Sequence, residues 1–247
     1  MGIVKSNGAI LWAGPSLLDG APIVVIAIGL NAGSSNPKTG DMLQTYILRS
    51  DMLPQAAIDC GSDVSICGDC PHRGNWSQGI GRTCYVNVGQ GPTVVYKTYQ
   101  RNGYPIATDI SVAGAGRVVR LGTYGDPAAV PVEVWDALVS RAVAHTGYTH
   151  QWKESTTLRH LCMASADSSK EASVAHVAGW RTFRVAMPNH IDRLHNESIC
   201  PASEEAGRKL TCDTCRACNG ANGRRGSIVI QAHGGTAVMA NVKRLAA

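Results

Sequence analysis

The sequence predicts an α/β fold in which βα units form a partial or complete barrel. Two observations carry this prediction. Short apolar runs alternate with helical segments through the second half of the chain, as in parallel sheets. Glycine, proline and asparagine clusters bound these runs, as they bound strands. With 247 residues and 44% hydrophobic residues, the chain can form one large domain, which we place at 1–247.

The expected elements follow from apolar periodicity and from capping residues. Asp167 and Ser168 are suited to begin a helix and Gly179 to end it, and Pro131 precedes another helix. The segment 31–41 has the composition of a loop. We expect strands at 9–12, 23–30, 42–48, 117–121, 160–165, 181–187 and 227–232, helices at 132–145 and 170–178, and a helical tail at 242–247.

The composition favours a cytoplasmic protein with bound metal. The longest apolar run, 22–30, is far shorter than the roughly 20 residues that span a bilayer. The N-terminal residues lack the features of a signal peptide. Nine cysteines without an export signal indicate a reducing compartment, where metal binding or catalysis is commoner than disulfides. The net charge of +5 permits contact with nucleic acid without requiring it.

The strongest motif is the late cysteine set, C-x11-C-x2-C-x2-C, in a loop at about 197–226. Two residues between cysteines allow a tight turn to direct both thiolates at one metal. Four thiolates suit either tetrahedral zinc or a [4Fe-4S] cluster. A remote cysteine followed by Pro201 favours the cluster, and zinc is the alternative. The predicted ligands are Cys200, Cys212, Cys215 and Cys218.

An early cysteine set lies in a glycine-rich loop at about 56–92. Cys67, Cys70 and Cys84 form C-x2-C-x13-C, which indicates a second metal site. Cys60 is the simplest fourth ligand and His72 is another candidate. An open fourth position, filled by substrate or water, is the further alternative. A ninth cysteine, Cys162, lies in an apolar strand and is predicted to be core.

Three candidate catalytic residues follow predicted strands: Asp126, His150 and Asp167. In parallel α/β folds the ligand crevice lies at the carboxyl ends of the strands, so these side chains are expected to share a pocket. A carboxylate or an imidazole there can bind substrate or transfer a proton. Each residue also has a structural interpretation. Asp126 is a good turn former, Asp167 a good helix cap, and His150 could be a buried histidine with its hydrogen bonds satisfied.

Basic residues surround the late cysteine set within the segment 208–225. They could present a surface to DNA or RNA, or they could offset the negative charge of a thiolate-ligated cluster. The basic residues are Arg208, Lys209, Arg216, Arg224 and Arg225. A small-molecule ligand is the other possible partner of the protein, and no membrane contact is expected.

Several segments resemble an uncharacterised, cysteine-rich family of actinobacterial phages and mobile elements. They are RVVRLGTYGDPAAVPVEVWDALV, GYTHQW, LCMASADSSKEASVAHVAGWRTFRV, CPASEEAGRKLTCDTCRACNG and the loop CGDCPHRG…CYVNVGQGP. The chain is more distantly similar to radical S-adenosylmethionine proteins, but without C-x3-C-x2-C, of which Cys67 and Cys70 reproduce only the C-x2-C half. The phage-type family has no settled activity, so the [4Fe-4S] prediction rests on the cysteine spacing. The resemblances imply a protein of phage type in the host cytoplasm, and a redox or radical-S-adenosylmethionine-like enzyme of unknown substrate. A zinc protein that contacts nucleic acid is the alternative.

Overall fold

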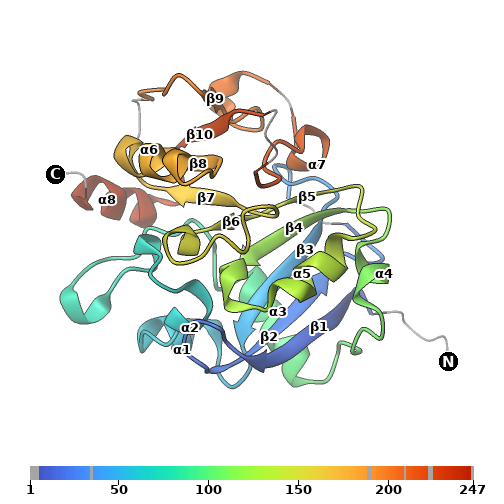
Figure 1. The fold of residues 1–247 in the computed structure, drawn as a ribbon. Helices are drawn as coiled ribbons and strands as arrows, with labels where there is room; N and C mark the ends of the chain where they lie inside the picture. The colour runs from blue at the N-terminus through green and yellow to red at the C-terminus, as the bar shows by residue number, and fades with distance from the viewer. Residues whose placement is uncertain (1–5, 34–35, 188–190, 209, 222–224, 246–247) are drawn as a thin grey trace.

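The computed structural model describes residues 6–33, 36–187, 191–208, 210–221 and 225–245, whose strands form two five-stranded sheets (Figure 1). The first sheet has the order β1-β2-β3-β4-β5. Its first three strands are antiparallel, and β4 and β5 continue from β3 in parallel. The bounds are β1 (Gly8–Pro15), β2 (Pro22–Ile28), β3 (Leu43–Arg49), β4 (Val118–Tyr124) and β5 (Ala144–Thr146).

The second sheet is parallel throughout and has the order β6-β7-β8-β10-β9. Its first strand follows β5 after the single residue Gly147, so one extended segment contributes an edge strand to each sheet. The bounds are β6 (Tyr148–Thr149), β7 (Met163–Ala166), β8 (Thr182–Ala186), β9 (Glu197–Ile199) and β10 (Ser227–Gln231). The chain is therefore a mixed α/β protein, and no closed barrel is present in the described part.

The helices are short and lie around the two sheets (Figure 1). At the start of α6, the Ser168 side chain accepts a hydrogen bond from the Glu171 backbone, as a helix cap should. The structure shows α1 (Pro54–Asp59), α2 (Val64–Cys67), α3 (Gly91–Gln100), α4 (Ile110–Gly114), α5 (Val132–Val139), α6 (Ser169–Val177), α7 (Cys212–Cys215) and α8 (Thr236–Leu245). The 3-10 turns are η1 (Pro71–Arg73), η2 (Trp76–Gln78), η3 (Pro127–Ala129), η4 (Gln151–Lys153) and η5 (Glu204–Ala206).

The main core lies on the first sheet. The run Ile23–Ala27 in β2 is at most 1% exposed at every residue, so both faces of this strand are buried. Trp135 and Leu138 of α5 pack into the same core. Cys162 is fully buried there, which confirms its assignment as a core residue.

Two expectations about elements were wrong. The helix predicted at 132–145 ends at Val139, and Ala144–Thr146 pairs with β4 as a strand. Apolar spacing continues across this boundary, so periodicity could not reveal the change. The loop at 56–92 also contains α1 and α2. Of the tail expected at 242–247, residues through Leu245 belong to α8 and 246–247 lie outside the described residues. None of the described helices has the length and apolar character needed to cross a membrane.

Candidate functional site

One cavity of about 610 Å³ brings the early and the late cysteine sets together. Alternate residues of successive strands form its floor, because side chains that point to one face of a sheet recur every second position. They include Gln44 and Tyr46 of β3, Arg120, Gly122 and Tyr124 of β4, Thr146 of β5, Tyr148 of β6, Ser165 of β7, Phe183 and Val185 of β8, and Ile230 of β10. Loops that carry the cysteines form the walls.

All three residues predicted at strand ends line this cavity. Asp126 follows β4, His150 follows β6 and Asp167 follows β7. These strands run in parallel, so their carboxyl ends reach the same side of the molecule. A fourth residue, His72 from η1, joins them and also lines the cavity.

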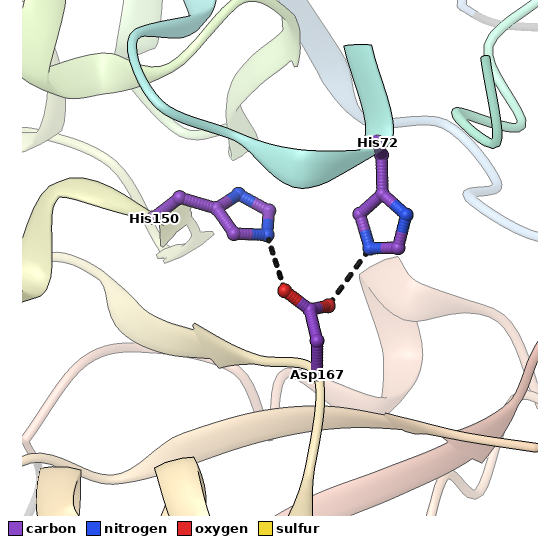
Figure 2. A group of neighbouring side chains, drawn as sticks. All are labelled: His72, His150 and Asp167. Atoms are coloured by element: carbon purple, nitrogen blue, oxygen red, sulfur yellow. Dashed lines mark hydrogen bonds and ion pairs between the residues drawn. The ribbon is translucent and has the colours of Figure 1, made fainter. Parts of the chain in front are cut away.

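Asp167 lies between the two histidines (Figure 2). Its Oδ1 is 2.8 Å from Nε2 of His72, and its Oδ2 is 3.5 Å from Nε2 of His150. The two rings meet edge to face, with centroids 5.6 Å apart. The other ring nitrogen of His72, Nδ1, is 2.8 Å from the Thr83 hydroxyl. His150 Nε2 also lies 3.9 Å from Sγ of Cys70, which links this group to the early cysteine set.

The electrostatics of this group favour a carboxylate beside positive charge. Burial alone would raise the pKa of Asp167, but its contacts with His150 and His72 hold the pKa well below its ordinary value. Burial alone would lower the pKa of His150, but contacts with Asp167 and Cys70 raise it well above the ordinary value. The site therefore stabilises an anion on Asp167 and a cation next to it.

Asp126 has a positioning role in the structure. Its Oδ1 accepts a hydrogen bond from the Ala128 backbone, and its Oδ2 accepts one from the backbone of His150 at 2.8 Å. The side chain is 7% exposed. Since both oxygens bind backbone amides, Asp126 fixes the turn after β4 and holds the segment that carries His150.

Hydrogen bonds within the loop bring the early cysteines together. The His72 carbonyl accepts hydrogen bonds from the backbones of Thr83 and Cys84, so Cys84 returns to the turn that carries Cys67 and Cys70. Burial raises the pKa of Cys67 well above its ordinary value, and negative charge on Cys70 and Cys84 raises it further. Three thiolates at this position therefore need a neighbouring cation.

Cys60 does not join this set. It lies just after α1, its side chain is exposed, and its thiol contacts the Ser62 hydroxyl at 3.1 Å. Cys60 is not among the residues that line the cavity. Of the two residues predicted as alternatives for the fourth ligand, His72 lines the cavity and Cys60 lies outside it.

The four late cysteines line the opposite part of the cavity: Cys200, Cys212, Cys215 and Cys218. Burial raises the pKa of Cys218 to about 12, with a further contribution from the other three thiolates. Burial likewise raises the pKa of Cys200 to about 11, with contributions from Cys212 and Cys215. With these raised pKa values Cys200 and Cys218 are neutral thiols at pH 7, and ionisation of the whole set would need a neighbouring cation.

The loop that carries the late set is held from several sides. The Arg181 guanidinium donates hydrogen bonds to the carbonyls of Ala217, Gly220 and Gly226 at 2.7–2.8 Å. At the start of α7, the backbones of Cys212 and Asp213 donate to the carbonyls of Lys38 and Thr39. The loop is thus fixed both to the second sheet and to the segment before β3.

Four buried donors near the cysteines have no hydrogen-bond partner among the described residues. They are the Tyr124 hydroxyl and the Nε atoms of Arg73, Arg82 and Arg120. Burial raises the pKa of Tyr124, and charges on Cys67 and Cys84 raise it further. Burial also raises the pKa values of Cys84 and Cys212, and the nearby Arg82 and Arg120 offset part of that rise. Buried donors of this kind normally have an acceptor, so they point to a missing anionic group beside the thiols.

The described basic residues near the late set differ in exposure, although the Arg225 guanidinium donates a hydrogen bond to the Arg216 carbonyl at 2.6 Å. Arg216 lines the cavity, and Nε of its side chain donates to the Asp213 carbonyl. Arg208 and Arg225 are exposed. Lys209 and Arg224 lie outside the described residues.

Sequence reasoning found the cysteines and the strand-end residues but gave His72 only a ligand role and missed Tyr124. The CPH triplet is the signal that could have raised the priority of His72, since a histidine two residues after a candidate ligand shares its turn. Nothing in the sequence marks Tyr124, which occupies one position among many in β4.

Comparison with known proteins adds no relative. No protein-family model, curated protein or solved structure matches this chain. Its function therefore has to be argued from the cavity.

Proposed function

We propose that the protein binds two iron–sulfur clusters in one cavity and acts there as a redox enzyme on a small molecule. The observation that carries the proposal is the meeting of the two cysteine sets on the same 610 Å³ cavity. The late set would supply four thiolates to a [4Fe-4S] cluster. The early set would supply three, from Cys67, Cys70 and Cys84, which leaves one iron open to the cavity.

The sequence pattern of the late set favours a cluster over zinc. Three cysteines in one compact C-x2-C-x2-C run are joined by the remote Cys200, which Pro201 follows, as in the three-plus-one layout of ferredoxin-type clusters. Structural zinc sites more often use two separate C-x2-C pairs.

The unpaired donors also fit a cluster. Bridging sulfides and thiolates accept hydrogen bonds, and such bonds tune the reduction potential of a cluster. Tyr124 and Arg82 would serve the early set, and Arg120 the late set. A zinc ion saturated with thiolates offers fewer acceptors, so these donors support the same choice.

The open iron and the cavity define the substrate position. Asp167 and His150 would act on a ligand held there, by binding it or by transferring a proton. The resemblance to radical S-adenosylmethionine proteins makes S-adenosylmethionine the first ligand to test. We also infer that strands β3 to β8 and β10 curve around the cavity as an open, partial barrel, since residues of each of these strands line it. A reducing compartment, such as the cytoplasm of a phage host, would keep the nine thiols available.

The test is anaerobic purification followed by absorption and EPR spectra and by iron and acid-labile sulfide analysis per chain. We expect a brown protein with about eight irons, and about four each in Cys67→Ser and Cys215→Ser. Cys60→Ser and Cys162→Ser are matched controls that should keep the full iron content. A colourless protein with stoichiometric zinc, or loss of iron in Cys60→Ser, would contradict the assignment.

The alternative function is a zinc protein that contacts nucleic acid through Arg208 and Arg225, which are exposed. It predicts binding to DNA or RNA that falls steeply with salt, because phosphate contacts release counterions. Fluorescence anisotropy of a labelled oligonucleotide at 50 and 200 mM salt measures this directly. Salt-dependent binding by a zinc-loaded protein would favour this alternative.

A further inference from the structure

The side chains of His72, His150 and Asp167, which all line the cavity, converge on one point in a way that the two cysteine sets do not explain. His72 comes from η1, His150 follows β6 and Asp167 follows β7, so three separate segments bring these side chains to one point. Both imidazoles direct Nε2 at the carboxylate (Figure 2). All three candidate ligand atoms lie within 4.8 Å of one another.

Hydrogen bonding alone accounts poorly for this geometry. His72 makes a normal contact with Asp167 at 2.8 Å, but His150 Nε2 remains 3.5 Å from the carboxylate and 3.9 Å from Cys70. A good hydrogen bond from a ring nitrogen to oxygen is about 2.9 Å long. The His150 nitrogen therefore faces the same point as that of His72 without making a close hydrogen bond.

We propose that His72, His150 and Asp167 bind one divalent first-row transition-metal ion, separate from the cysteine-ligated clusters. Two histidines and one carboxylate on one side of an ion form a facial triad that leaves coordination positions open. All three residues line the cavity, so the open positions face it. Water, or a carboxylate or carbonyl oxygen of a bound small molecule, would occupy them.

The surrounding contacts hold the ligands as they are held in metal sites. The Thr83 hydroxyl, 6% exposed, contacts Nδ1 of His72 at 2.8 Å and so directs Nε2 into the site. Asp126 holds the backbone of His150 at 2.8 Å, and the Asp167 backbone donates to Glu171 at 2.9 Å. Each ligand thus has its own positioning contact.

Manganese is the probe that separates this site from the cysteines, because Mn²⁺ prefers oxygen and nitrogen ligands and soft thiolates do not suit it. The experiment titrates the full-length, anaerobically purified protein with MnCl₂ and follows free Mn²⁺ by EPR. We expect one Mn²⁺ per chain. His72→Gln, His150→Gln and Asp167→Asn should each weaken binding by more than about 100-fold, and Thr83→Val should weaken it less, by about 10- to 100-fold, as the loss of an outer contact does.

The matched control is His160→Gln. His160 contacts Asp136 through Nε2 at the same 2.8 Å, but this pair is exposed and outside the cavity, so binding should be unchanged. Cys67→Ser should lose iron and keep Mn²⁺, whereas Asp167→Asn should lose Mn²⁺ and keep its iron. These two variants therefore distinguish failure of this proposal from failure of the cluster proposal.

Circular dichroism and the denaturation midpoint of each variant show whether it is folded, and Asp167→Ala, which also lacks the carboxylate, replaces Asp167→Asn if the latter is not. The proposal is overturned if Mn²⁺ does not bind, or if folded His150→Gln and Asp167 variants bind it as the wild type does. In either case the three residues form only a hydrogen-bonded acid–base group.

Discussion

Some buried polar groups in this protein have hydrogen-bond partners and others have none among the described residues. A buried group without a partner is expected to lower the stability of the fold. His145 in β5 is a clear case. Its Nε2 is buried and has no hydrogen-bond partner among the described residues, and burial lowers the pKa of the ring below its ordinary value. Its protonation therefore opposes folding.

His145→Gln should reduce the loss of stability at mildly acidic pH. Below about pH 6.5 an unfolded chain binds a proton at this position that the folded chain does not, so the free energy of unfolding falls as pH falls. The contribution of this one group reaches about 1.4 kcal/mol per pH unit until its folded pKa is reached. Urea denaturation at pH 7.5 and 5.5 measures the difference between wild type and variant.

The control for this prediction is His195→Gln, because His195 is exposed. Its loss of stability between the two pH values should match that of the wild type. If His145→Gln loses as much stability on acidification as the wild type, the buried ring does not cause the effect.

At the scale of elements, the passage from β5 to β6 connects the two sheets. Gly147 donates its backbone N–H to the Cys218 carbonyl at 3.1 Å and accepts a hydrogen bond from Met163. A Cβ at this position would lie 2.8 Å from Sγ of Cys162 and 3.2 Å from the Leu161 carbonyl. Only glycine therefore fits between the core and the late cysteine loop.

Gly147→Ala should destabilise the protein by about 1–3 kcal/mol, as overpacking of a core does. Adding Cys162→Ala should recover part of this loss, because it removes the sulfur that the new methyl group contacts. Denaturant titrations of both single variants and the double variant give the coupling energy. Gly235→Ala is the control, since nothing lies within 4 Å of its added Cβ. A purely additive double variant would contradict the steric explanation.

The sequence predicts an element well when the local residue pattern determines it. It predicts an element poorly when contacts with residues far away in the chain determine it. Strand β2 and helix α6 follow from an apolar run and a serine cap. By contrast, β5 forms because β4 lies beside it, and the local pattern there continues that of α5. The candidate site shows the same difference between local pattern and distant contact. Cysteine spacing reveals both sets, but the approach of His72 to Asp167 joins residues 95 positions apart.

At the scale of the whole molecule, the first sheet has its own core, to which the late cysteine loop does not contribute. The main hydrophobic cluster contains residues of β2, β3, β4 and α5, and none of the late cysteines belongs to it. The late set packs in a smaller cluster with Met163, Ile228 and Ile230. If the cysteines bind metal as proposed, its loss should therefore destabilise the cysteine loops and leave the first sheet folded.

Removal of metal by chelation should open the loops around 68–90 and 200–221 and leave the first sheet folded. Each 1.4 kcal/mol of local stability lost should speed proteolytic cleavage about tenfold, when cleavage follows the population of the open form. Limited proteolysis with mass spectrometry locates the cuts before and after chelation. First cuts within β2 or β3 would show that the metal supports the whole fold.

The contact of α7 with Lys38 and Thr39 also has a consequence during synthesis. Residues 212–213 dock on a segment made about 170 residues earlier, so this contact can form only when most of the chain has been synthesised. Until then the segment before β3 lacks the partner that fixes it, and the cavity lacks the wall that carries Cys212 and Cys215.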